Sequence, residues 1–459
     1  MKRTKYIYIS AFALAVSLSA CNKVLDIKPK ETIDQSTAIV TSDDVQSTLV
    51  GAYNRTAVVD VLGGRMQMEQ DLLATQNILD FNGTYLELAQ MTGQNIANNN
   101  IFVEYTWQYS YQAINLANNV IANLAKADAD QRDRMEGEAK FIRGTLYFEL
   151  TREFGRAWND GDPNVNLGVP IVTTPTTTVT SASYVSRATV KQCYDQAISD
   201  LKTAESKLPE TNSFYAGKYA ASAILARLYL QQGDYANALT EANTVITSAQ
   251  YSLTAKYSDE FPIPGKPTHV DNTTEDIFAM QVTEQQGTNG LNEFYASTGN
   301  GGRGDLRVHT DFVAGFAATD TRGQFFTART NDDGSVAFYR TKKFDNTYGN
   351  VHVVRLAEMY LIRAEANLAK GSATGASPLS DVNKIRARAG ITPLTTVTLA
   401  AILTERIHEL CFEGGFALHD AKRLKQPVNG LLYSSPKLIF PIPQQELLAN
   451  KNLVQNQGY

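Results

Sequence analysis

The sequence predicts a mostly α-helical protein in which pairs of helices form a scaffold and long loops and a minor β-hairpin interrupt it. Apolar residues recur with the 3.6-residue period of a helix along 113–124, 139–150 and 399–411. Between such stretches lie segments rich in Gly, Pro and Thr, which favour loops. Both observations favour stacked helix pairs over a sheet-based fold.

The clearest helix pair spans residues 222–245 and resembles a tetratricopeptide repeat. Gly233 and Asp234 form its turn, and the small residues Ala226 and Ala238 allow the two helices to approach closely. Stacked units of this kind share one continuous core. We expect such units at about 104–153, 190–249, 354–390 and 398–425.

The N-terminus has the features of an export signal. A positive stretch with Lys2, Arg3 and Lys5 precedes an uncharged, largely apolar segment at 6–18, which is too short to span a bilayer. The sequence Leu-Ser-Ala-Cys then ends at Cys21 and looks like a bacterial lipobox. We expect a signal peptide at 1–20, lipidation of Cys21, a tether at 21–34 and a single domain at 35–459.

Composition narrows the class of protein. Of the 459 residues 43% are hydrophobic, which is typical of a globular chain. The formal net charge is −5, and it becomes −8 once three basic residues of the signal are removed. An acidic chain repels phosphate backbones, so nucleic acid is not an expected partner. Cys193 and Cys411 either pair or remain as buried free thiols.

Four segments fall outside the repeats. The first, residues 163–186, has several Thr between 173 and 180. The second, residues 261–276, contains three Pro, and the third, residues 287–304, contains six Gly. Residues 331–348 alternate weakly and indicate a small hairpin. Long loops in compact proteins usually carry function, so we expect the binding site on loops.

Catalytic patterns are incomplete in this chain. Residues 299–304 match the pattern G-x-G-x-x-G, and Asp320 lies about 20 residues further along the chain. No apolar strand precedes the pattern, so a flexible loop is favoured over a dinucleotide site. S-x-x-K occurs at Ser199 and Ser434 without its partner motifs. We therefore expect no enzyme activity and no cofactor.

Four residues near the C-terminus are close enough in sequence to suggest a metal site. The possible ligands lack the spacing of a known metal site: His408, Glu413, His419 and Asp420. The acids and Arg406 around them favour a charged helix face with i, i+4 pairs. We therefore expect no metal. Trp107 and Trp158 favour packing over ligand stacking.

The motifs of the whole chain, taken in order, resemble the SusD/RagB family. The first group runs through Val24, Leu25, Asp26 and Pro29, then Trp107, Tyr111, Ile114, Ala117 and Asn118, then Glu138, Ala139, Phe141, Arg143, Gly155 and Gly168. The second runs through Arg355, Glu358, Glu365, Asn383, Arg386, Arg388, Gly390, Glu405, Arg406, Glu409, Glu413, Gly414, Phe440, Pro441, Asn456 and Tyr459. After Gly414 the chain is one residue longer than the family pattern and lacks its Arg, which puts packing detail in doubt.

The resemblance implies a lipid-anchored protein on the outer face of the outer membrane. It implies capture of glycans, or of peptides as in some members, for a SusC-type TonB-dependent transporter. It places the site by region only, at about 77–105 and 285–350. Within these regions we expect ligand contacts from exposed polar and aromatic residues: Asp80, Asn82, Tyr85, Asn98, Asn100, Phe102, Tyr295 and Arg303. A protein-binding scaffold and an enzyme remain the alternative classes.

Overall fold

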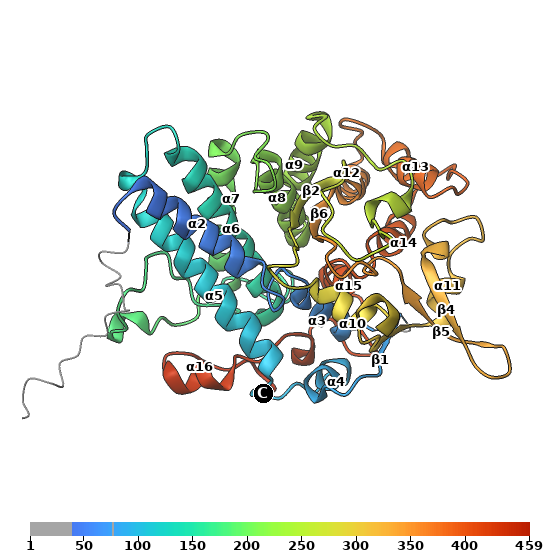
Figure 1. Cartoon of the computed structure of the whole chain (residues 1–459), viewed down its shortest axis with the longest axis horizontal. Coiled ribbons are helices and arrows are strands. Elements are labelled where there is room, and N and C mark those ends of the chain that lie inside the picture. The colour runs from blue at the N-terminus through green and yellow to red at the C-terminus, as the bar shows by residue number, and fades with distance from the viewer. Residues whose placement is uncertain (1–38, 76–77) are drawn as a thin grey trace, which may run out of the picture.

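The computed structural model describes residues 39–75 and 78–459, and Figure 1 shows them as a layer of helices joined to a smaller, strand-containing part. The expected signal peptide, Cys21 and the tether lie outside the described residues. The predicted mostly α-helical class is confirmed. No helix in the described ranges has both the length and the apolar character needed to cross a bilayer.

The helical layer is built by neighbouring antiparallel helices in near sequence order. Helix α2 packs on α5, α5 on α6, and the series continues through α7, α8, α9 and α12 to α13 and α14. Their bounds are α2 Ser42–Thr56, α5 Ile101–Ala122, α6 Arg132–Phe154, α7 Val190–Lys207, α8 Lys218–Gln232, α9 Tyr235–Thr247, α12 Leu356–Lys370, α13 Pro378–Arg388 and α14 Leu399–Leu410.

The pair α8–α9 shows why these residues fold as they do. Gly233 ends α8 in the left-handed region at φ 74°, and the Asp234 side chain accepts a hydrogen bond from the Asn237 amide to begin α9. Ala226 and Ala238 are fully buried between the helices. The predicted turn and the close approach are both present.

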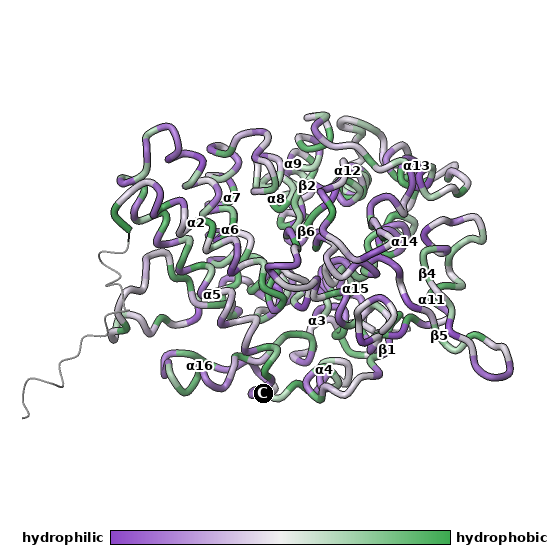
Figure 2. The backbone as a smooth tube through the Cα atoms, in the orientation of Figure 1, coloured by the Kyte–Doolittle hydropathy of each residue, from purple (hydrophilic) through white to green (hydrophobic). Residues whose placement is uncertain are grey.

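Shorter helices connect this layer to the rest of the molecule. They are α3 Arg65–Leu73, α4 Leu86–Thr92, α10 Gly290–Tyr295, α11 Thr310–Ala314, α15 Phe416–Arg423 and α16 Gln444–Ala449. Figure 2 shows hydrophobic segments running along the helices of the layer, as expected for a shared core.

Two small antiparallel sheets complete the fold. The first has the order β1-β3-β5-β4 and the second pairs β2 with β6. The bounds are β1 Leu79–Phe81, β2 Asp276–Met280, β3 Leu306–Val308, β4 Phe326–Thr330, β5 Val336–Thr341 and β6 Val351–Arg355. The predicted hairpin is confirmed as β4–β5, although it begins before residue 331, and Figure 1 shows it projecting from the body.

One loop prediction was wrong. The Gly-rich stretch 287–304 contains the buried helix α10, begun by the Asn289 side chain, which accepts from the Leu291 and Asn292 amides. The glycines after this helix allow the chain to turn back closely against it. A Cβ on Gly302 would lie 2.3 Å from the Ala296 carbonyl oxygen, so only glycine fits there.

Candidate functional site

The two segments expected to carry the site lie side by side. Strand β1 pairs with β3 in the register Leu79–Val308, Asp80–Arg307 and Phe81–Leu306. Two stretches of chain more than 200 residues apart in sequence therefore form one surface at this edge of the molecule. The family resemblance implied both regions, but not their pairing.

Tyr85 and Arg303 meet at the centre of this surface. The Arg303 guanidinium carbon lies 4.7 Å from the Tyr85 ring centroid, a cation–π distance. Arg303 also donates from Nε to Asp305 at 2.7 Å and from Nη2 to the Thr84 hydroxyl at 3.1 Å. Arg303 is exposed and Tyr85 half-buried, so both remain accessible.

Three more of the expected residues are exposed, and two of them, Asp80 and Asn82, contact β3 or the residue after it. Asp80 is exposed, and its Oδ2 lies 2.8 Å from Nε2 of His309. Asn82 is exposed, and its amide oxygen, in the orientation that satisfies the contact, accepts from Arg307 at 2.8 Å. Asn98 is exposed, and its carbonyl accepts from the Gln444 amide at the start of α16.

Asn100 and Phe102 lie in the interior instead of on the surface. Asn100 is 2% exposed and begins α5, where its side chain accepts from the Phe102 and Val103 amides. The Phe102 ring packs edge-on against Tyr85 at 5.5 Å and Phe294 at 6.3 Å. These two residues support Tyr85 from below, because a capped helix and an aromatic cluster fix its position.

The expectation that Tyr295 is an exposed loop residue was wrong. Its side chain is 1% exposed within α10, and its hydroxyl donates to Asp71 at 3.0 Å. Burial raises the pKa of Asp71 to about 7, and that of Tyr295 well above its usual value. Tyr295 thus joins α10 to α3 in the core, out of reach of solvent.

The G-x-G-x-x-G pattern has a structural explanation at this surface. Gly304 adopts φ +66°, and a Cβ there would lie 2.6 Å from the Arg340 guanidinium. The missing side chain lets Arg340 lie flat against the backbone and donate to the Gly304 carbonyl at 2.8 Å. The glycines therefore form a turn that receives an arginine.

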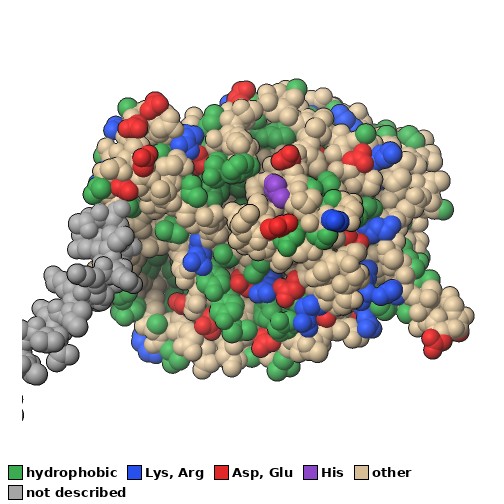
Figure 3. All heavy atoms as spheres, in the orientation of Figure 1, with side chains coloured by type: hydrophobic (Ala, Val, Ile, Leu, Met, Phe, Trp, Pro, Cys, Tyr) green, Lys and Arg blue, Asp and Glu red, His purple; other side chains and the backbone are tan. Residues whose placement is uncertain are grey.

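The outer face of the four-stranded sheet carries basic residues that the sequence analysis did not name. Arg307, Arg329 and Arg340 are at least partly exposed, as is Phe338 between them. Figure 3 shows Lys and Arg side chains over the region of α10, β1 and β5. The alternation of Arg307 and His309 could have indicated this face, because period-two polar residues mark the solvent side of a strand.

The acids of α14 are buried, so the predicted charged helix face was wrong. Glu405 and Glu409 are at most 2% exposed, and their partners come from other elements and not from i, i+4 positions. Arg355 at the end of β6 donates to Glu409 at 2.6 Å and to Glu275 at 2.7 Å. We call this set the buried ion network: Glu275, Asp320, Arg322, Lys343, Arg355, Arg386, Arg388, Glu405, Glu409 and Glu413.

The residues weighed as metal ligands do not converge. His408 stacks on Phe316 at 4.0 Å, His419 shares a hydrogen bond with Gln70, and Asp420 pairs with Arg406. Burial lowers the pKa of His408 to about 4, so its imidazole is neutral at physiological pH.

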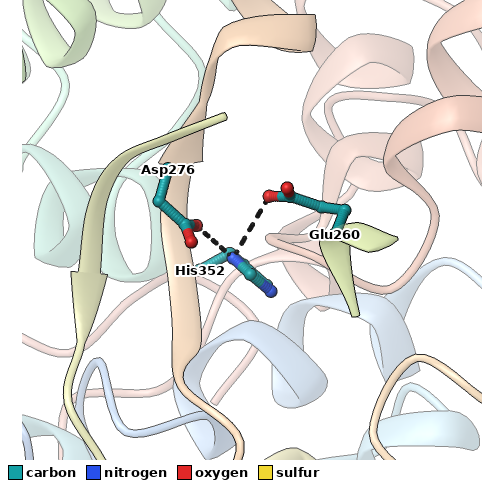
Figure 4. Close-up of side chains that lie close together, drawn as sticks. All are labelled: Glu260, Asp276 and His352. Carbon is teal, nitrogen blue, oxygen red and sulfur yellow. Dashed lines mark hydrogen bonds and ion pairs between the residues drawn. The ribbon is translucent and has the colours of Figure 1, made fainter. Parts of the chain in front are cut away.

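A different cluster gathers three possible ligands within the described residues. Glu260, Asp276 and His352 are all buried between the second sheet and the loop before it (Figure 4). His352 Nδ1 lies 2.5 Å from Asp276, a direct hydrogen bond, whereas two ligands of one metal ion would lie about 3 Å apart. Burial opposes a charged imidazole, but Asp276 outweighs it and raises the pKa of His352. The geometry fits a buried ion pair better than a metal centre.

A groove of about 720 Å³ lies elsewhere, between α5, the 163–186 loop and α16. Three of its polar side chains are engaged with that loop. Tyr111 donates to the Pro170 carbonyl, Asn118 to the Val172 carbonyl, and Asn115 accepts from the Thr176 amide. We therefore take the Tyr85–Arg303 surface as the stronger candidate, since its polar groups face solvent.

The helical repeats hold loops and a small sheet in place. These loops and the sheet form one exposed surface of polar and aromatic residues, which is typical of a binding protein. Comparison with known proteins agrees. The model of the SusD family matches residues 194–431, and a model described as "starch-binding associating with outer membrane" matches residues 23–230. The chain belongs to the SusD family.

Individual relatives support this assignment. SusD-like protein P2 of Formosa agariphila is 25% identical, with 100% of both chains covered. Starch-binding protein SusD of Bacteroides thetaiotaomicron is 30% identical over 179 residues, 36% of this chain and 30% of that protein. A crystal structure of a putative sugar binding protein from Bacteroides vulgatus superposes with a TM-score of 0.80 at 25% identity, covering 92% of this chain and 100% of the other.

Proposed function

We propose that the protein captures glycans at the cell surface and delivers them to a SusC-type TonB-dependent transporter. The observation that carries the proposal is the surface at Tyr85 and Arg303, where an accessible ring lies beside hydrogen-bonding groups from two distant segments. Sugar rings stack their C–H faces on aromatic rings, while polar side chains bind the hydroxyls.

The relatives support the same class of ligand. The protein of Bacteroides thetaiotaomicron is named for starch binding, and the structure from Bacteroides vulgatus is titled a putative sugar binding protein. Both are named for binding and neither for catalysis. We propose that this chain binds its ligand without converting it.

Isothermal titration of the purified chain from residue 22 with a panel of oligosaccharides tests glycan capture. We expect micromolar to millimolar affinity, because a few hydroxyl hydrogen bonds contribute only about 0.5–1.5 kcal/mol each. Tyr85→Ala should weaken binding, whereas the exposed Tyr184, on the 163–186 loop, serves as the matched control in Tyr184→Ala. Equal binding by both variants would contradict the proposed surface.

Peptide capture is the second candidate. The two tryptophans do not contribute to the proposed surface, because Trp107 is buried against Phe154 and Trp158 packs on Tyr194. A surface without Trp is expected to stack sugar rings less strongly than one with Trp. Binding of peptides and of no glycan in the same titration would establish the peptide role. New reducing ends at a turnover-like rate would contradict binding without conversion.

The proposed location at the outer membrane depends on Cys21. We propose that lipid on this residue anchors the chain with its binding surface outside the cell. Cys21→Ala should release the protein from the membrane fraction without lowering its melting temperature. Retention of the variant in cells that lack the transporter would argue against lipid anchoring.

A further inference from the structure

The outer face of the β1-β3-β5-β4 sheet carries more positive charge than its own acids balance. We propose that this face recognises an anionic group, a carboxylate or a sulfate, carried by the glycan. This inference rests on the proposed glycan capture and adds the chemical class of the ligand.

The strand register places the arginines together. Residues that face each other across antiparallel strands point to the same side of the sheet. The pair Val308–Tyr339 sets Arg307 against Arg340, and β4 sets Arg329 directly opposite Phe338. Both Arg307 and Arg340 lie over the Phe338 ring, at 4.6 and 5.2 Å from its centroid.

Two acids lie on this face and already have partners there, and one of them, Asp80, stands opposite Arg307 in the strand register. Asp80 lies against His309, and Asp305 accepts from Arg303. Asp305 and Asp345 attract Arg340, yet burial together with the charges of Arg329 and Arg307 lowers its pKa. At Arg340, repulsion by Arg329 and Arg307 therefore exceeds the attraction of these two acids.

The guanidinium groups also retain free donors. Arg307 faces the neutral amide of Asn82, and Arg340 donates to the Gly304 carbonyl. The Nε atoms of both are buried and have no acceptor in the described part of the chain. The side chain of Arg329 pairs with no acid in the described ranges. A ligand cannot reach these buried Nε atoms, so the donors left for an incoming anion are the Nη groups of the two arginines and the exposed Arg329.

Phe338 holds the guanidinium groups in place for an oxyanion. Stacking on one ring restricts Arg307 and Arg340 before the ligand arrives, which lowers the entropy lost on binding. A guanidinium presents paired N–H donors that match the oxygens of carboxylate or sulfate. The apolar ring edge can meanwhile contact the sugar that carries the anion.

The test compares four probes by isothermal titration at low and high salt. The probes are an oligogalacturonate for carboxylate, a carrageenan oligosaccharide for sulfate, a neutral malto-oligosaccharide and a glutamate-rich peptide. We expect an anionic glycan to bind more tightly than the neutral one and to weaken with salt. Arg307→Gln should reduce that affinity about ten-fold, because it removes a charge-assisted contact.

Arg132→Gln is the matched control, since it removes the same charge from the exposed start of α6. It should leave all affinities unchanged. The carboxylate and sulfate arms identify which anion is preferred. Neutral binding that equals anionic binding and is unaffected by Arg307→Gln overturns the anionic class but leaves glycan capture standing. Binding of the peptide alone, or of no probe by folded protein, overturns both proposals.

Discussion

Two groups of arginines in this protein differ in how their charge is balanced. In the buried ion network, Arg355 contacts Glu275, Glu409 and Glu413, each within 2.7 Å. On the outer sheet face, Arg307 and Arg340 share the Phe338 ring, Arg329 lies across the strand from it, and few acids lie nearby. The same side chain is thus fully paired in one region and underpaired in the other.

The difference separates a structural role from a binding role. A buried charge must be paired within the fold, because no solvent can stabilise it. The network accordingly joins the second sheet, the stretch around Arg322 and Lys343, and helices α13 and α14. A partly exposed charge tolerates an incomplete partner set, so the sheet face can leave part of its pairing to a ligand.

Breaking the network should have the largest effect. Glu409 is fully buried and contacts Arg322, Arg355 and Arg388. We expect Glu409→Ala to lower the free energy of unfolding by about 3–5 kcal/mol, because it leaves buried guanidinium groups uncompensated. Urea denaturation measures the change, and Glu284→Ala at an exposed turn is the control. A loss below about 1 kcal/mol would remove the distinction between the regions.

The network should also dominate the acid sensitivity. Burial acts against ionisation of Glu413, but Arg355 and Lys343 outweigh it and lower its pKa from 4.5 to about 2. The stabilisation is therefore complete above pH 4.5 and is lost as pH falls through about 2.

Over that range wild type should lose roughly 3 kcal/mol more than Glu413→Gln, which has no such proton to bind. Unfolding free energies measured at several pH values decide this. Parallel pH curves would show that Glu413 is not held ionised.

Two tyrosines sharpen the comparison at smaller cost. Tyr295→Phe should lower the unfolding free energy by about 1–2 kcal/mol, because buried Asp71 loses its hydrogen bond. Its ligand affinity should stay unchanged. Tyr85→Ala should clearly lower the ligand affinity and change the unfolding free energy less than Tyr295→Phe does. Titration and thermal melts of both variants test this, and a binding defect in Tyr295→Phe with unchanged stability would contradict the assignment.

The smallest effect is expected at Arg329. Its side chain has no hydrogen bond to lose in the described ranges, while it repels Arg340. Without ligand, Arg329→Gln should raise the unfolding free energy by a few tenths of a kcal/mol, about the size of a like-charge pair on a sheet. Added salt should remove the gain. A destabilised variant would mean that the arginines are already balanced within the fold.

The sequence predicted the helices well and the site only by region. Helical periodicity is local, so α5, α6, α8, α9 and α14 could be recognised from their own residues. The pairing of β1 with β3 depends on strands of three residues, too short to show a pattern.

Burial was the main source of error at single residues. Tyr295 is polar and lies within a Gly-rich stretch, yet it is in the core because α10 packs against α3. Glu409 and Arg355 are of residue types that usually lie on the surface, yet they are paired with each other in the interior. Such pairs join residues distant in sequence, so no local pattern reveals them.

Among the described residues, Cys193 and Cys411 are both free and buried. Cys193 lies on α7, while Cys411 follows α14 beside the ion network, where burial raises its thiol pKa to about 11. A thiol reacts only when the fold opens enough to admit the reagent. In a Cys21→Ser background, thiol labelling therefore reports local opening at two places. The labelling rate at Cys193 measures how often the fold opens around α7. The labelling rate at Cys411 measures how often it opens at the end of α14, beside the buried ion network.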